Sequence, residues 1–153
     1  MRLPIDGGRI PRSGNGAFGA RRSPTHVHQG LDIAAPEGTP VRAADSGVVV
    51  CVVRPGTRGF SGYGACIVIA HERPERAGKL WTLYAHLKPD TARFLAGDLV
   101  RMGDHIADVG ASCGTVEDPD KRCGGAHLHF EASKTPYPQR SEAPRLDPTF
   151  FLS

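Results

Sequence analysis

The chain has 153 residues, which is enough for one domain with a buried core. Hydrophobic residues make up 39% and charged residues 23%, a balance typical of a folded globular protein rather than a disordered one. The formal net charge is +3 and the chain has no long run of Lys or Arg, so we expect no nucleic-acid partner. No apolar run approaches the roughly 18 residues of a membrane span, and the first residues lack the apolar core of a signal peptide.

Glycine and proline indicate the fold class. The 19 Gly and 13 Pro residues exceed what helices tolerate and predict many turns between short strands. We therefore predict a mainly β fold, built on an antiparallel sheet, with little helix. Residues 1–25 are rich in Gly, Arg, Pro and Ser and show no hydrophobic periodicity, so we expect an extended N-terminal arm with little chemistry. Residues 26–153 are then the single folded domain.

Several β-rich segments follow along the chain. The predicted strands are residues 41–43, 47–53, 65–70, 80–86, two short segments within 97–110, and 127–132. The second and third of these form a hairpin with a long loop. Alternation along residues 80–86 places Thr82, Tyr84 and His86 on one face. Tyr84 either lines the site or makes an aromatic contact across the sheet.

The last predicted strand, His127-Leu128-His129-Phe130-Glu131, has two chemically different faces. Because side chains alternate along a strand, Leu128 and Phe130 should both point into the core. His127, His129 and Glu131 should line the opposite face, with about 7 Å between successive Cα atoms. Two imidazoles would then share one cleft, and Glu131 would either hydrogen-bond a neighbouring site residue or form a salt bridge.

The chain has seven histidines, and any single histidine is more often structural or exposed than catalytic. Zinc used in hydrolysis takes three N or O ligands from the protein and leaves a fourth position for water. His28 and Asp32, on a loop entering a strand, would supply such a set together with His129, which leaves His127 free to transfer protons. Taken alone, the H-x-x-x-D motif of residues 28–32 and the H-x-H motif of residues 127–129 are each more often structural. We expect three other histidines at the surface: His26, His71 and His105.

Taken in this order, with the intervening Tyr84-Ala85-His86-Leu87, these motifs resemble the lysostaphin-type zinc metallopeptidases, a family of peptidoglycan endopeptidases. The similar stretch runs from about residue 18 to about residue 131, and it includes residues 28–32, 36–49, 62–64, 97–98 and 127–131. The resemblance implies an antiparallel β fold with one Zn²⁺ in a groove, and residues 26–153 as the metallopeptidase domain. It implies five site residues: His28, Asp32 and His129 as ligands, and His86 and His127 as the non-ligand pair.

The resemblance predicts hydrolysis of peptide bonds in peptidoglycan stem peptides or cross-bridges by a cell-wall lytic enzyme, of phage or secreted origin. His127 would take the proton of the zinc-bound water, and His86 would hydrogen-bond the oxyanion. The alternative is an inactive relative that binds wall peptides or activates an amidase. Such domains usually lose ligands, whereas all five positions are present here. We expect a monomer that acts on the cell wall, in the extracellular or periplasmic space, after lysis, dedicated secretion or removal of a leader.

The sequence departs from the family pattern at three places. Ala65 follows Gly-Tyr-Gly where relatives often have Asn, and no Tyr shortly precedes His28. The third departure is an insertion at about residues 113–123, before the H-x-H strand, which we expect to rim the cleft.

Four cysteines and the tail complete the predictions. Cys113 and Cys123 bracket the insertion, and a disulfide between them would add about 2–3 kcal/mol of stability. Cys51 and Cys66, in the hairpin, are either paired or buried free thiols. The tail ends in aromatic residues within 147–152, which we expect to pack back onto the domain.

Overall fold

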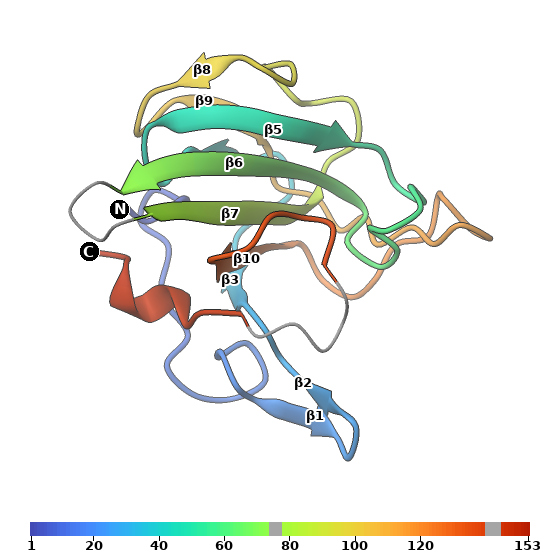
Figure 1. Cartoon of the computed structure of the whole chain (residues 1–153). Helices are drawn as coiled ribbons and strands as arrows, with labels where there is room; N and C mark the ends of the chain where they lie inside the picture. The colour runs from blue at the N-terminus through green and yellow to red at the C-terminus, as the bar shows by residue number, and fades with distance from the viewer. Residues whose placement is uncertain (74–77, 140–144) are drawn as a thin grey trace.

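The computed structural model describes residues 1–73, 78–139 and 145–153 and is almost entirely β (Figure 1). The strands are β1 (Arg21–Ser23), β2 (His26–Val27), β3 (Leu31–Ala34), β4 (Pro40–Arg42), β5 (Gly47–Val53), β6 (Ala65–Arg73), β7 (Gly78–Leu87), β8 (Leu99–Val100), β9 (His105–Asp108) and β10 (His127–Ser133). One 3-10 turn, η2 (Pro148–Phe150), lies in the tail. The predicted mainly β fold with little helix is confirmed. No helix in the described ranges is long and apolar enough to span a bilayer.

Six strands form one antiparallel sheet in the order β3-β10-β7-β6-β5-β8, so the H-x-H strand β10 lies between β3 and β7. The register places His129 opposite Asp32 of β3 and opposite Ala85 of β7. Residues directly opposite each other point to the same face of a sheet. Pairing of β10 with β3 therefore brings together side chains that are 97 residues apart in the chain.

The other face of β10 packs into the main core. Leu128 and Phe130 are fully buried, as the alternation predicted. Tyr84 of β7 is also fully buried and meets Phe130 edge-on, with ring centroids 5.1 Å apart. Its hydroxyl accepts a hydrogen bond from the backbone N–H of Ala44. Of the two alternatives for Tyr84, the structure therefore shows the aromatic contact across the sheet.

Both ends of the chain are tied to this sheet. Ile5, from the N-terminal segment, is buried in the main core. In the tail, Leu146 pairs with Ala132 of β10, and Leu152 packs against the core. Phe150 is 80% exposed, so the prediction that the tail aromatics pack back onto the domain is wrong for this residue. The contacts that hold this part of the tail include the backbone pairing at Leu146 and the packing of Leu152 against the core.

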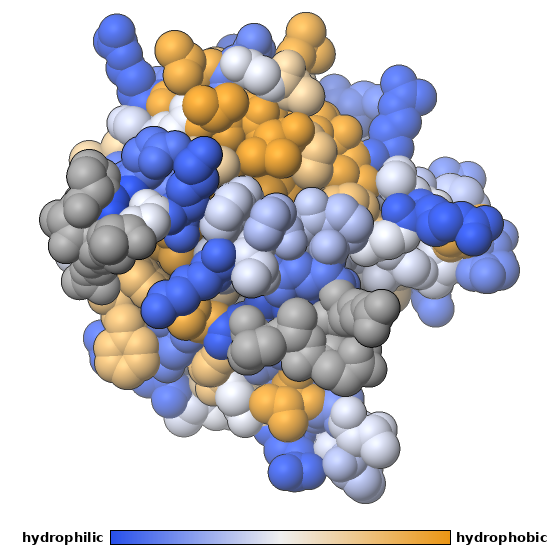
Figure 2. Space-filling view, viewed as in Figure 1, coloured by the Kyte–Doolittle hydropathy of each residue, from blue (hydrophilic) through white to orange (hydrophobic). Residues whose placement is uncertain are grey.

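Exposed apolar side chains gather over β5 and β8, at the edge of the sheet farthest from β3 (Figure 2). The exposed large hydrophobic residues in this part of the chain are Val48, Val50, Val52, Leu95, Leu99 and Met102. The strand order places β6 and β7 between these two strands and β10. The apolar surface is therefore separate from the two histidines of β10.

His71 corrects one of the surface predictions. It is fully buried, because β6 extends to Arg73 and keeps His71 inside the sheet. Its Nδ1 donates to the carbonyl of Ser46 at 2.8 Å, and its Nε2 lies 2.8 Å from the hydroxyl of Thr82. Burial lowers the pKa of His71. His26 is exposed and His105 is partly exposed.

The cysteines behave in two ways. Cys113 and Cys123, for which the sequence left a disulfide open, are bonded to each other. Cys51 and Cys66 are free thiols, because the hairpin register pairs Cys51 with Val68 and Cys66 with Val53. The sequence left open whether Cys51 and Cys66 are paired or free, and the structure shows free thiols.

Candidate metal centre

Three predicted ligands converge where β3 and β10 pair. His28 precedes β3, Asp32 lies on β3 and His129 lies on β10. One donor atom from each of them lies within 4.8 Å of the other two. Asp32 Oδ1 is 3.1 Å from His28 Nε2 and 2.8 Å from His129 Nδ1. The three residues thus form one compact cluster of nitrogen and oxygen donors.

The ring nitrogens that face away from the cluster are held by acceptors. His28 Nδ1 donates to the carbonyl of Ala17 at 2.9 Å, and His129 Nε2 donates to Glu131 Oε1 at 2.9 Å. A carbonyl or carboxylate oxygen only accepts hydrogen bonds, so in the neutral form of each ring His28 Nε2 and His129 Nδ1 have their lone pairs directed at the cluster. These two nitrogens are 3.1 Å apart. Lone pairs this close, next to a carboxylate, repel unless a cation or proton lies among them, and a His/Asp/His set fits Zn²⁺.

The other two predicted site histidines stand beside the cluster. The rings of His86 and His127 have centroids 4.8 Å apart, and His86 lies 5.7 Å from His129 by the same measure. His127 Nε2 is 3.8 Å from Asp32 Oδ1. The structure therefore brings all five predicted site residues together.

His86 reaches the site by a route that alternation did not predict. An uninterrupted strand would point His86 to the same face as Tyr84, away from His129. The β6–β7 register instead shifts between Ala65, opposite Leu87, and Ile67, opposite Tyr84, which leaves an extra residue on β7. His86 itself has a positive φ of 56°. This bulge turns the imidazole to the face that carries His129, so the predicted face for His86 is wrong.

Backbone carbonyls orient both non-ligand histidines. Nδ1 of His86 donates to the carbonyl of Ser112 at 2.7 Å, and Nδ1 of His127 donates to the carbonyl of Gly125 at 2.8 Å. Whenever such a ring is neutral, its Nε2 atom carries a lone pair and can only accept. Burial, together with the nearby His129, lowers the pKa of His86 to about 4, so the neutral form prevails at neutral pH. Hydrogen-bond donation to an oxyanion would need a proton on this nitrogen.

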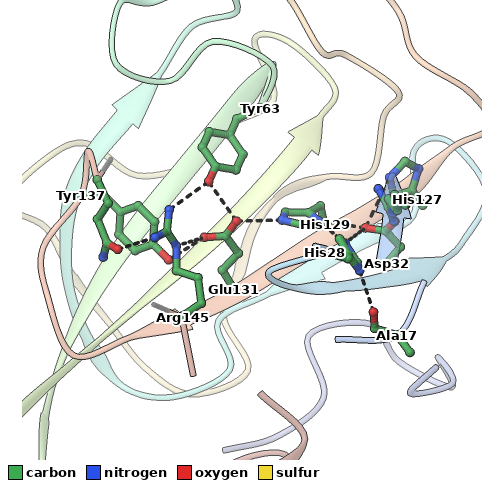
Figure 3. Close-up of polar contacts among 11 residues, drawn as sticks. Ala17, His28, Asp32, Tyr63, His127, His129, Glu131, Tyr137 and Arg145 are labelled. Carbon is green, nitrogen blue, oxygen red and sulfur yellow. Dashed lines mark hydrogen bonds and ion pairs between the residues drawn. The ribbon is translucent and has the colours of Figure 1, made fainter. Parts of the chain in front are cut away.

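Behind His129 lies a buried carboxylate with four donors around it (Figure 3). Glu131 is 2% exposed. Its Oε1 accepts from His129 and from the Tyr63 hydroxyl at 2.9 Å, and its Oε2 accepts from the Tyr137 hydroxyl at 2.8 Å and from Arg145 Nε at 2.7 Å. Glu131 thus fulfils both roles that the sequence left open, since it hydrogen-bonds a site residue and forms a salt bridge.

These contacts set the charges of the cluster. Burial opposes ionisation of Asp32, but hydrogen bonds from His129 and His28 outweigh it and hold the Asp32 pKa well below its usual range. Burial likewise opposes charge on Glu131, yet His129 and Arg145 lower its pKa to about 2. His129 is disfavoured as a cation by burial, but hydrogen bonds to Asp32 and Glu131 raise its pKa to about 9. The centre therefore holds two carboxylates in their ionised forms.

Residues that the sequence analysis missed surround the donors. The N-terminal arm, predicted to have little chemistry, supplies the Ala17 carbonyl to His28, and Arg22 of β1 forms an ion pair with Asp32 Oδ2. From the tail, Tyr137 and Arg145 reach Glu131. Backbone carbonyls leave no mark in a sequence, and no spacing rule links Arg22 or Arg145 to the histidine motifs.

The Cys113–Cys123 insertion frames one side of the non-ligand pair. Cys113 follows Ser112, which orients His86, and Cys123 lies two residues before Gly125, which orients His127. A cavity of about 610 Å³ borders the insertion. Its lining includes Leu87, Lys88, Ser112, Pro119 and Lys121, but none of the five predicted site residues. The cavity is therefore distinct from the metal centre.

An antiparallel β domain with a His/Asp/His donor cluster where β3 and β10 pair defines a class of hydrolytic metal-centre proteins. More specifically, the chain belongs to peptidase family M23, whose family model matches residues 26–142. This confirms the resemblance predicted from the motifs. Arg22 and Arg145 both lie outside the matched range.

The relatives and solved structures agree with this assignment. The chain is 40% identical over 119 residues to the DD-carboxypeptidase/endopeptidase Mpg of Neisseria meningitidis. The matched region covers 75% of this chain but only 23% of Mpg. It thus spans about a quarter of the length of that relative. A zinc-containing peptidase of Vibrio cholerae is 30% identical, with a TM-score of 0.66 over 95% of this chain and 38% of that one. Lysostaphin of Staphylococcus simulans is 25% identical, with a TM-score of 0.65 over 90% of this chain and 47% of that one.

Proposed function

We propose that the protein is a zinc-dependent endopeptidase that hydrolyses peptide bonds in peptidoglycan stem peptides or cross-bridges. The observation that carries this proposal is the convergence of His28 Nε2, Asp32 Oδ1 and His129 Nδ1, with their outward atoms already engaged. Membership of family M23 supports a peptidase, and the names of Mpg and of the zinc-containing peptidase support the substrate class and the metal. The site of action would be the bacterial cell wall.

In this proposal His28, Asp32 and His129 hold one Zn²⁺, which when bound lowers the pKa of water towards 7 and polarises the scissile carbonyl. His127 accepts a proton at Nε2, because its Nδ1–H is engaged by the carbonyl of Gly125. The same ring then returns the proton to the leaving amine. In His28, His127 and His129, one ring nitrogen donates a hydrogen bond that positions the ring, and the other binds the metal or accepts the proton.

His86 takes a different role from the one predicted. Its neutral Nε2 accepts, so His86 would orient the attacking water or the substrate amide N–H by accepting a hydrogen bond. It would donate to an oxyanion only after gaining a proton during turnover. His86 and His127 are then two acceptors placed side by side above the donor cluster.

Metal analysis combined with wall digestion tests the proposal. We expect one Zn²⁺ per chain, loss of activity on chelation, and recovery on addition of zinc. Digestion of purified peptidoglycans of different cross-link chemistry, with fragments identified by mass, should show cleaved peptide bonds. His26→Ala is the matched histidine control, because His26 is exposed and outside the cluster, and it should behave as wild type. Full activity after complete metal removal, or zinc binding without cleavage of any wall, would refute the proposal.

A further inference from the structure

The tail residue Arg145 shares a buried carboxylate with a proposed metal ligand. The side chains of Arg145 and Glu131 are 3% and 2% exposed, and Nε of Arg145 lies 2.7 Å from Oε2 of Glu131. The other oxygen of Glu131 accepts from Nε2 of His129. The chain of contacts therefore runs from the tail, through β10, to the donor cluster (Figure 3).

Arg145 is itself held from several sides. Its Nη1 donates to Gln139 Oε1 at 2.6 Å, its Nη2 donates to the Tyr63 hydroxyl at 3.4 Å, and its guanidinium lies 5.2 Å from the centre of the Tyr137 ring. A planar guanidinium with this many fixed partners has one orientation, which a lysine cannot reproduce. The side chain thus presents a rigid positive charge to the rear of Glu131.

A buried carboxylate needs such a partner. Glu131 is buried opposite Leu83 of β7, and an ionised carboxyl in a buried site is costly unless it is paired and hydrogen-bonded. A carboxylate that accepts from the outer N–H of a metal-binding histidine fixes the ring and raises the basicity of its other nitrogen. A neutral or rotated Glu131 would lose both effects.

We propose that Arg145 is a positioning residue for the metal centre, which acts through Glu131 to orient and polarise His129. The inference rests on the proposed zinc site, although Arg145 itself lies outside the range matched by the family model. In this arrangement the tail is part of the metal centre. Without Arg145, His129 keeps its place on β10, but Glu131 loses the cation that holds it ionised and oriented towards His129 Nε2.

A double-mutant cycle on zinc affinity tests whether Arg145 acts through Glu131. In the wild-type background Arg145→Met should weaken zinc binding about 10–100-fold, the usual effect of losing an outer partner of a metal ligand. In the Glu131→Gln background, which is already weakened, Arg145→Met should add less than about 2-fold. Arg145→Lys, which keeps the charge and loses the planar fork, should fall between the wild type and Arg145→Met. Affinity is measured by chelator competition on the full chain, under conditions where circular dichroism shows each variant folded.

The control is Arg73→Met, because Arg73 forms a partly buried ion pair with Asp45 at 2.9 Å, away from the donor cluster. Its zinc affinity should stay within about 2-fold of wild type. If Arg145→Met does not fold, Arg145→Lys takes its place in the cycle, and its zinc affinity is measured in both the wild-type and the Glu131→Gln background. Wild-type affinity in a folded Arg145 variant, or equal weakening in both backgrounds, overturns the inference. A wild type that binds no zinc refutes the proposed function instead, and the wild-type measurement separates these two failures.

Discussion

The candidate metal centre has two sides, and each is built on an arginine paired with a carboxylate. On the closed side, formed by His129, Glu131 and Arg145, the paired side chains are 3% and 2% exposed. On the open side, formed by Asp32, His127 and Arg22, the side chains of Arg22 and Asp32 are 34% and 18% exposed. The same chemical pair is therefore desolvated on one side and hydrated on the other.

This difference in burial assigns different tasks to the two sides. Charges in a low-dielectric interior interact strongly and depend on every partner, whereas hydrated charges are screened. The closed side can therefore fix a ligand ring, and its loss is expected to be costly. The open side has freedom to admit substrate and water. We expect substitutions to separate these tasks.

The largest effect should come from the two histidines of β10. His129→Ala removes a proposed ligand on the closed side and should lose both zinc and turnover. His127→Ala, on the open side, should keep zinc and melting temperature but lose about 10²–10⁴ in rate, the usual contribution of a positioned base. Metal analysis and kinetics on both purified variants check this. A zinc-free His127→Ala protein with a zinc-loaded His129→Ala protein would reverse the assignment.

The two arginines should differ in their contribution to stability. Arg145→Met removes the buried cation that pairs with Glu131 Oε2 and should lower the free energy of unfolding by about 3–5 kcal/mol. Arg22→Met breaks a partly exposed pair and should cost about 0–1 kcal/mol. Urea unfolding of the metal-free proteins at low temperature measures both values. Equal losses for the two variants would contradict the contrast in burial.

The disulfide braces the open side, because its two half-cystines adjoin the segments that orient His86 and His127. The double variant Cys113→Ser/Cys123→Ser should lose about 2–3 kcal/mol of stability. Its KM for wall fragments should rise more than its zinc content falls. Cys51→Ser, a change at a free cysteine, serves as the thiol control. Loss of zinc with an unchanged KM would show that the disulfide supports the metal ligands rather than the open side.

The smallest expected effect is the pH dependence of the metal-free closed side. The pKa of Glu131 is lowered to about 2, so its contribution to stability is present above about 4.5 and is lost as pH falls through 2. The pKa of His129 is raised to about 9, so its contribution is present below about 6.5 and is lost as pH rises through 9. Stability should therefore peak near pH 5–6 and fall by at least about 1 kcal/mol towards pH 3 and pH 9.

Urea unfolding at these pH values checks the prediction, and Glu131→Gln provides the comparison. That variant has no carboxylate to titrate, so its profile should flatten on both sides of the maximum. A wild-type profile parallel to that of Glu131→Gln would show that the buried pair does not govern stability.

Sequence reasoning predicted the parts of this protein that follow from periodicity. Alternation along β10 correctly separated Leu128 and Phe130 from His129, because apolar residues occupy one face of the strand and titratable residues the other. The donor cluster was predicted from the combination and order of two motifs, His28-x-x-x-Asp32 and His127-x-His129, which together resemble a known family. A bulge has no such signature, so alternation put His86 on the wrong face.

Contacts between distant segments were the least predictable part. The pairing of Arg145 with Glu131 depends on how the tail crosses β10, and the contact of Ala17 with His28 uses a backbone atom that every residue has. His71 was misplaced because the length of β6 is set by its pairing with β7 rather than by local composition. These features follow from tertiary packing, which local patterns do not encode.

The left-handed backbone at His86 has a consequence for any exchange at that position. Among residues other than glycine, asparagine and aspartate tolerate a φ of 56° best, whereas β-branched residues are strongly disfavoured. His86→Asn therefore removes the imidazole with little change to the chain path, while His86→Val would also straighten the bulge and move Ser112 and Leu87. Only the first exchange isolates the ring, so position 86 is constrained twice, once by its side chain and once by the handedness of its own backbone.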